Sequence, residues 1–218
     1  GQSADAVFER EDLQALAPLI AATTRRQVSG VVQEVTLARG DLSGIANSPY
    51  APAGSRNIFE PAIEVTHADG NNSLDLKFVS TKTEKVNDDI SLTTVDLKDP
   101  VYDFQVTLFY KTYYKDNVVE QWAVLKHHEK GNVVLHKFAS ANLYLQGKSF
   151  YLRQYHGDWA QEIQPEEERI THGIKTLDSK LGTRADIFQP PVFMVAFDHP
   201  SQEDEGEVML GSIEWSGN

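Results

Sequence analysis

Four glutamates in the second half of the chain are the residues whose type and spacing could do chemistry. Glu162 is followed by the run from Glu166 to Glu168. Glycoside hydrolysis uses two carboxyl groups roughly 5 to 10 Å apart, one kept protonated and one ionised. Spacing along the sequence does not set that distance, and carboxylates this close together in a hydrophilic loop are usually solvated. We therefore interpret the four as surface charge and assign no catalytic residue.

Other catalytic and metal-binding signals are missing from the sequence. The chain has no GxSxG, GxxxxGK[ST] or HExxH motif. It has no cysteine, which excludes a disulfide, a thiolate nucleophile and a cysteine zinc site. His127 and His128 are adjacent, so on a strand they point to opposite faces and cannot chelate one ion together. The acidic run Glu203 to Glu205 is typical of a solvated loop. We expect no metal and no cofactor.

Aromatic residues could bind sugars by stacking on the apolar faces of sugar rings. Trp122 and Trp215 lie in alternating patterns typical of strands, which favours a place in the core or at an interface. Trp159 follows Gly157 and Asp158 at the end of a strand, where an amphipathic ring can cap the sheets or face a partner. Trp159 and Trp215 are the interface candidates.

Charge and composition exclude several classes of partner. The net charge is −12, from 32 acidic and 20 basic residues, and no lysine or arginine cluster alternates with aromatics. Nucleic acid and anionic membranes are therefore poor partners, and no apolar run approaches the about 18 residues that span a bilayer. Gly1 is typical of a remnant of tag removal, and the small, polar residues after it, without an initiator methionine, are typical of a mature start after signal-peptide cleavage. We expect export to the periplasm or the extracellular space.

Hydrophobic residues alternate with a period of two from about Ile58 onward, which predicts strands. Asp69 and Gly70 favour a tight turn that would join Ile63–His67 to Leu74–Phe78 in a hairpin. Further turn signals separate more runs, which we expect to form successive antiparallel hairpins. The remaining predicted strands are 102–110, 118–126, 133–145, 149–156, 191–197 and 207–215.

Many short strands without intervening helices predict an all-β fold, a large antiparallel β-sandwich with little helix. With 218 residues the chain is long enough for a sizeable core, and we expect one domain over residues 1–218. Residues 1–52 give no consistent pattern and are assigned only to a leader and a loop.

Four segments together resemble a known family. They are FEPAIEVTHADGN (Phe59 to Asn71), YHGDWAQE (Tyr155 to Glu162), the spacing of Ser179, Gly182 and Pro190, and the closing GSIEWSGN. From about Ala53 to Asn218 the sequence is similar to the N-terminal domain of glycoside hydrolase family 36 α-galactosidases. The resemblance implies a β-supersandwich, followed after the SGN residues by a catalytic (β/α)8 barrel. The alternation that runs through Leu210, Ile213 and Trp215 into Ser216 also looks like a strand entering a connector.

The resemblance implies that catalysis lies outside this chain. In the family the barrel carries two aspartates, a nucleophile and an acid/base, which hydrolyse terminal α-linked galactose with retention. We therefore expect this chain to be inactive alone, to pack on its own barrel and to form homo-oligomers. The family's loop before EPA implies substrate-rim residues, here Arg56 and Asn57, although Asn57 and Phe59 stand where relatives have Asp and Arg. The segment Thr183 to Asp186 also departs from the family, which leaves α-N-acetylgalactosaminidase activity open.

Two alternative functions belong to other classes of protein. A stand-alone carbohydrate-binding module would bind glycans through its tryptophans and tyrosines. An interaction or oligomerisation domain would self-associate through a large apolar surface without affinity for sugar.

Overall fold

The structure is a computed structural model, and it describes residues 50–54, 60–143, 145, 147–178 and 188–213. The chain divides into two compact units, one up to Leu145 and one from Gln146 onward. We describe each unit by itself, and the expectation of a single domain stays a prediction. In the described part, only Phe188 has helical conformation, and no helix is long and apolar enough to cross a membrane.

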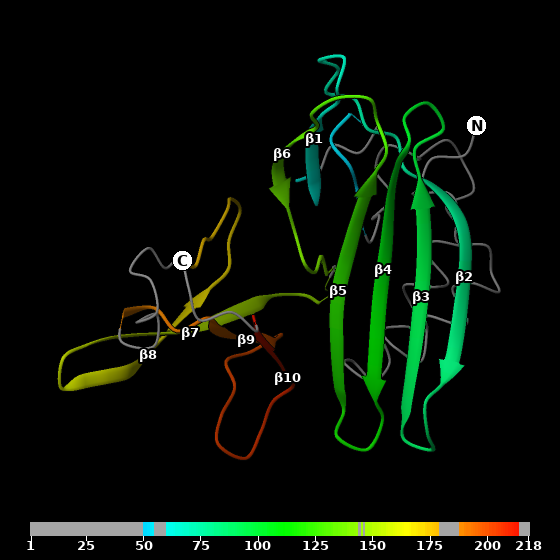
Figure 1. The fold of residues 1–218 in the computed structure, drawn as a ribbon. Helices are drawn as coiled ribbons and strands as arrows, with labels where there is room; N and C mark the ends of the chain where they lie inside the picture. The colour runs from blue at the N-terminus through cyan, green and yellow to red at the C-terminus, as the bar shows by residue number, and fades with distance from the viewer. Residues whose placement is uncertain (1–49, 55–59, 144, 146, 179–187, 214–218) are drawn as a thin grey trace. The chain divides into compact units, whose positions relative to one another are not determined.

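The first unit contains one two-stranded and one four-stranded antiparallel sheet (Figure 1). Its strands are β1 (Ile63–Thr66), β2 (Lys77–Lys85), β3 (Ile90–Lys98), β4 (Phe104–Tyr113), β5 (Val118–His127) and β6 (Val134–Phe138). The four-stranded sheet has the order β2-β3-β4-β5, in which each strand pairs with the next along the chain. The predicted hairpin of strands 102–110 and 118–126 is confirmed, since β4 and β5 pair from Tyr113↔Val118 to Phe104↔His127.

The core of the first unit lies on one face of the four-stranded sheet. Strand β4 alternates buried and partly exposed residues along its whole length, as a period of two requires. Its buried side chains pack with those of β1, β3 and the segments around residues 50 and 75. The cluster comprises Tyr50, Ala62, Ile63, Val65, Leu74, Leu76, Val95, Leu97, Phe104, Val106, Leu108 and Tyr110. Two layers therefore enclose one hydrophobic core in this unit.

Three of the predicted hairpins are wrong: 63–67 with 74–78, 118–126 with 133–145, and 133–145 with 149–156, since β6 pairs with β1 and the strand Phe150–Asp158 pairs with two later strands. The Asp69–Gly70 turn forms, with Gly70 at φ 88°, but β1 pairs with β6 (Ile63↔Phe138) and not with the residues after the turn. The strand after Asn132 therefore does not pair with β5. Leu74 and Leu76 lie outside any strand and are fully buried. Burying these leucines against the sheet determines the path of the chain here, and a turn signal carries no information about it.

The segment around Pro52, predicted as a loop, is held against β1 where the structure describes it. Pro52 forms an isolated parallel bridge with Ile63, and the Ala62 N–H donates to the Ala51 carbonyl at 2.7 Å. Gly54 has φ +92°, and a Cβ there would come 2.8 Å from the Cα of Ser73. Only glycine fits this close approach without strain.

The second unit is a four-stranded antiparallel sheet in the order β10-β9-β7-β8. Its strands are β7 (Phe150–Asp158), β8 (Gln161–Arg169), β9 (Val192–Phe197) and β10 (Val208–Ser212). Leu152, Val195 and Met209 are buried on one face, where Phe150 also meets Phe197 edge to face at 5.5 Å between ring centroids. The prediction of an all-β, antiparallel fold with little helix is confirmed.

Candidate functional site

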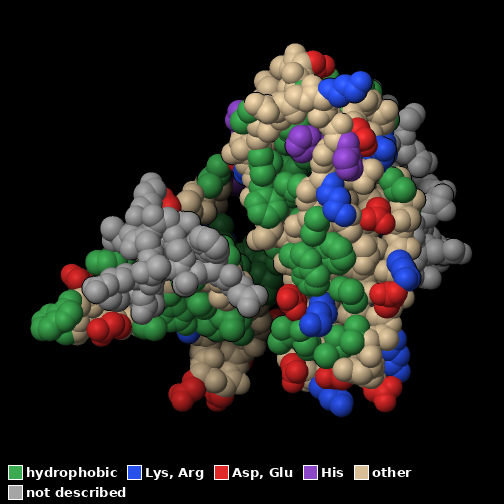
Figure 2. All heavy atoms as spheres, viewed as in Figure 1, with side chains coloured by type: hydrophobic (Ala, Val, Ile, Leu, Met, Phe, Trp, Pro, Cys, Tyr) green, Lys and Arg blue, Asp and Glu red, His purple; other side chains and the backbone are tan. Residues whose placement is uncertain are grey.

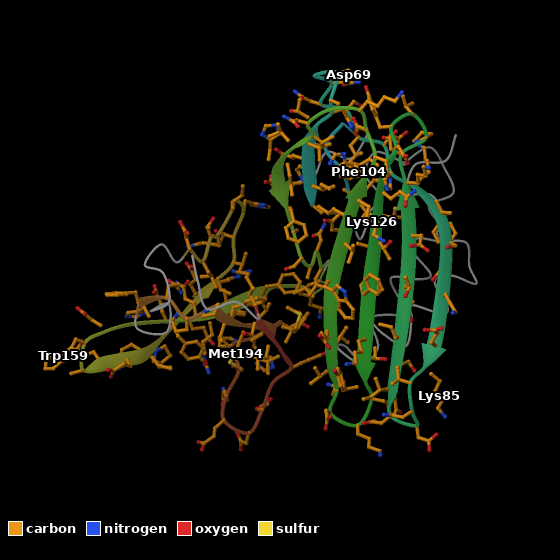
Figure 3. The ribbon with its side chains drawn as sticks, in the orientation of Figure 1. Asp69, Lys85, Phe104, Lys126, Trp159 and Met194 are labelled. Carbon is orange, nitrogen blue, oxygen red and sulfur yellow. The ribbon has the colours of Figure 1, made fainter. Side chains whose placement is uncertain are left out.

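Three loops meet at one end of the four-stranded sheet and are joined to one another by side-chain hydrogen bonds. They are His67–Ser73 after β1, Asp99–Asp103 between β3 and β4, and His128–Gly131 after β5, and we call them the loop clasp. In Figure 3, Asp69 lies at this end of the sheet, near Phe104, and Lys85 lies at the opposite end. The clasp contains the HADGN motif that the sequence analysis singled out.

His67 is the buried centre of the clasp. It is 2% exposed, and its Nδ1 lies 2.8 Å from Oε1 of Glu129, whose side chain is 7% exposed. The second oxygen of Glu129 accepts the backbone N–H of Ala68 at 3.0 Å. The ring of Tyr102 stacks on the imidazole, with centroids 3.6 Å apart and planes within 6°. One carboxylate thus binds both the side chain and the backbone of the loop after β1.

Asp69 and Tyr102 form a second, exposed set of contacts. The hydroxyl of Tyr102 donates to Oδ2 of Asp69 at 2.9 Å and accepts from Nδ2 of Asn71 at 2.8 Å. The backbone N–H of Asn71 donates to Oδ1 of Asp69 at 3.0 Å. These hydrogen bonds, that of the Asn71 backbone first and that of Tyr102 next, lower the pKa of the Asp69 carboxyl. The bond to Asp69 raises the pKa of the Tyr102 hydroxyl.

Asp99 fixes the connection between β3 and β4. It is 3% exposed, and its Oδ1 accepts the backbone N–H groups of Val101 at 2.7 Å and Tyr102 at 2.9 Å. Its Oδ2 accepts the backbone N–H of Asp75 at 2.7 Å, which ties this connection to the segment before β2. A buried carboxylate with three backbone donors is satisfied and holds the loop that presents Tyr102.

A shallow hollow of about 310 Å³ opens on the clasp. Its lining residues are Ala68, Asp69, Val101, Tyr102, Asp103, Glu129 and Lys130. A catalytic acid and base would need carboxyl groups free to exchange a proton with a substrate. Asp69 and Glu129 each accept two hydrogen bonds from the clasp itself, and the described residues hold no group of three side chains suited to a metal ion. The clasp is therefore built to hold loops together.

The four glutamates considered at the outset lie on strand β8, where the sequence analysis had expected a loop. Glu167 pairs with Arg153 at 2.9 Å, and Glu168 pairs with Lys175 at 2.5 Å. Glu166 accepts from Nε2 of Gln154 at 3.3 Å, and Glu162 is exposed. These are ion pairs and hydrogen bonds along a strand, which agrees with their interpretation as surface charge.

Of the predicted site residues, only Trp159 lies within the described part of the chain; Arg56, Asn57 and Trp215 lie outside it. Trp159 is 86% exposed at the turn between β7 and β8, visible at the tip of that hairpin in Figure 3, and its backbone N–H donates to Oδ1 of Asp158. Trp122 is partly buried and stacks on Phe109 at 4.9 Å between centroids. Within the first unit, Trp122 is not among the residues of the clasp.

Sequence reasoning missed the partners of the HADGN motif. Tyr102 and Glu129 are 31 and 62 residues from Asn71 and His67, the motif residues they contact. Asp99 lies 24 residues from Asp75, which follows the motif. No spacing rule links residues so far apart. The available signal was the motif itself, since a buried histidine requires a polar partner somewhere in the chain.

Comparisons with known proteins agree on one family. Residues 11–218 match the glycosyl hydrolase family 36 N-terminal domain. "Alpha-galactosidase Mel36A" of Lactobacillus acidophilus is 30% identical over 183 residues, which are 78% of this chain and 25% of that protein. "Alpha-galactosidase 1" of Pediococcus pentosaceus is 28% identical over 184 residues, again 78% of this chain and 25% of that protein. The chain thus spans about a quarter of the length of these relatives.

Solved structures show the same fold. The α-galactosidase from Lactobacillus brevis superimposes with a TM-score of 0.71 at 22% identity, covering 79% of this chain and 25% of that one. The family 36 α-galactosidase AgaB from Geobacillus stearothermophilus gives 0.72 at 20% identity with the same coverage. The likeness confirms the predicted large antiparallel β-sandwich.

Proposed function

The chain belongs to the glycosyl hydrolase family 36 N-terminal domains, and from this premise we propose that it is the non-catalytic domain of an α-galactosidase whose barrel cleaves terminal α-linked galactose. The observation that carries the proposal is the match over residues 11–218 together with the quarter length of the relatives. In this proposal, the reaction takes place in the other three quarters of the parent enzyme, outside this chain.

The chemistry of the clasp supports a structural role for this domain. Glu129 and Asp99 accept hydrogen bonds from backbone N–H groups, and Asp69, whose carboxyl pKa is lowered, accepts one from the Tyr102 hydroxyl. These carboxyl groups therefore stabilise loops. The partner of the domain is the catalytic barrel of its own polypeptide. Homo-oligomer formation, a contribution of Arg56 and Asn57 to the rim of the galactose pocket, and export of the enzyme are further parts of the proposal.

An assay of the intact parent beside this chain tests the proposal. We expect the parent to cleave an aryl α-galactoside and the 218-residue chain to leave it intact. An aryl α-N-acetylgalactosaminide in the same assay shows whether the parent accepts the related sugar. Activity in the chain alone, or a gene that ends near Asn218 without a barrel, would contradict the proposal. A gene that encodes Met directly before Gln2, without a hydrophobic leader, would contradict export.

The rim residues are tested in the same parent enzyme. Replacing both Arg56 and Asn57 by alanine should raise KM for galactosides, because a rim residue contributes binding energy to substrate. An unchanged KM would remove both residues from the site while leaving the family function intact.

A stand-alone carbohydrate-binding module is the second candidate, and the exposure of Trp159 favours it. An indole that is 86% exposed offers a ring face on which a sugar can stack. This candidate predicts affinity of the isolated chain for raffinose that Trp159→Ala abolishes, whereas the domain proposal predicts no such affinity.

A further inference from the structure

Strand β5 differs from the other sheet edges of the described residues in lacking protection. An edge strand presents unpaired backbone N–H and C=O groups to any strand that approaches, and proteins usually blunt such edges with lysines, proline, bulges or short length. β5 (Val118–His127) ends the order β2-β3-β4-β5. No backbone hydrogen bond joins its free side to another described residue.

Each of the other sheet edges in the described residues carries a blunting feature or is short. β2 contains Lys77, Lys82 and Lys85 and has a register shift between Phe78 and Ser80. β8 contains Pro165 and four glutamates, and Ile163 has φ 52°, far from extended backbone. β10 has five residues, and the edges β1 and β6 have four and five.

β5 has two charged side chains, Glu120 and Lys126, and none of the other blunting features. It is ten residues long, VVEQWAVLKH, without glycine or proline. It pairs with β4 in unbroken register over all ten residues. Six of the ten side chains are apolar, so the strand is long, regular and attractive for pairing. Figure 2 shows green apolar side chains among blue and red charges on the visible face of this sheet.

We propose that β5 pairs antiparallel with β5 of a second copy of this chain, around a two-fold axis at Ala123. In an antiparallel pair, residues directly opposite share one face of the sheet, so residues of the outer face must meet each other. Phe109 and Trp122 lie on this outer face, opposite to the buried Leu108. Glu120, Val124 and Lys126 share the face of Trp122 because they differ from it by even numbers of positions.

The register centred on Ala123 places opposite charges against each other. It sets Glu120 of one copy across from Lys126 of the other, and the two-fold axis repeats the pair. It also sets Trp122 across from Val124, an aromatic against a β-branched side chain, which is a favourable cross-strand pair. A shift of two residues in either direction loses the pairing of charges. Glu120 is already 3.7 Å from Nζ of Lys111, so the incoming lysine joins an existing ion pair at a half-exposed position.

This inference deepens the homo-oligomer part of the proposed function by identifying the contact, and its test is independent of enzyme activity. Sedimentation equilibrium of the 218-residue chain should show a reversible dimer. Glu120→Lys and Lys126→Glu should each weaken dimerisation by about tenfold in Kd, because each replaces two attractive pairs by two repulsive ones. The double variant restores opposite charges and should return Kd to within about threefold of the original.

A matched control comes from the opposite edge of the same sheet. Lys82→Glu on β2 changes the same charge by the same amount at a side chain that is 73% exposed, and it should leave Kd unchanged. A monomeric chain, or a dimer in which the double variant behaves like the single ones, would overturn the proposal.

Amide hydrogen exchange gives a second readout. The outward-directed amides of β5 should be protected at dimer concentrations and exchange freely on dilution. Protection that persists in the monomer would mean that another segment of the same chain covers this edge, and that result also overturns the proposal.

Discussion

At the residue scale, Glu129 is the group on which the loop clasp depends. It is almost fully buried and supplies both of its oxygens to the segment after β1, one to Nδ1 of His67 and one to the N–H of Ala68. Removing the acceptor of the buried His67 ring costs the desolvation of the nitrogen left without a partner, and this exceeds the net value of the hydrogen bond itself.

Glu129→Ala should therefore lower the free energy of unfolding by about 2 kcal/mol, within the about 1 to 3 kcal/mol expected for an unsatisfied buried group. Urea denaturation of the chain measures the change. Glu84→Ala is the control, because Glu84 is 54% exposed and pairs with Lys82 at the surface, and it should change stability by no more than about 0.5 kcal/mol. Equal effects of the two variants would show that the clasp adds nothing to stability.

At the element scale, β4 is the strand that organises the first unit. It pairs with both β3 and β5 over its whole length, and its buried face carries Phe104, Val106, Leu108 and Tyr110. The alternation visible in the sequence is the alternation found in the structure. The sequence did not reveal that β1 packs against this face and pairs with β6. Four strands separate β1 from β6 along the chain.

Leu108→Ala tests the central place of β4. Leu108 is 1% exposed in the core cluster, so truncating it leaves a cavity and should cost about 2 to 5 kcal/mol of unfolding free energy. Val118→Ala, at a side chain 49% exposed on the neighbouring strand, should cost less than about 0.5 kcal/mol. Chemical denaturation of both variants gives the comparison. A Leu108 variant as stable as the Val118 variant would place the core elsewhere.

At the scale of the whole molecule, stability should depend on pH through two tyrosines buried in the core. Burial raises the pKa of Tyr50 from 10.0 to about 12 and raises that of Tyr110 as well. The folded state therefore keeps these protons at a pH where the unfolded chain has lost them. The stabilisation is complete below pH 10.0, the unfolded value, and it is lost as pH rises through the folded values.

Denaturant midpoints measured at several pH values test this linkage. Tyr50 should contribute little change in the midpoint up to about pH 9, and the midpoint should fall steeply between about pH 10 and 12. Tyr50→Phe should make the midpoint fall less steeply at alkaline pH, because only Tyr110 then keeps a proton that the unfolded chain loses. Tyr114→Phe, at a side chain 78% exposed, should keep the full slope. An identical slope in both variants would argue against a buried titrating Tyr50.

The sequence by itself determined the class of fold, most strand positions and the family. A period of two is a local property, so runs such as Tyr102–Tyr110 reveal their strands without any partner. Family motifs are local too, which is why HADGN was noticed before its role was known. The interface residues Trp159 and Trp215 were predicted from local pattern too, whereas the rim residues Arg56 and Asn57 were predicted from the family resemblance.

Only the tertiary structure decided which strands pair and which side chains form the clasp. β1 pairs with β6 although an adjacent turn favoured another partner, and His67 meets Glu129 62 residues away. Long-range pairing depends on which arrangement buries Ile63, Leu74 and Leu76 against the sheet at the smallest loss of chain entropy. That balance is a property of the whole unit, because the cluster that buries these leucines includes residues distant in the sequence, such as Val95 and Leu108.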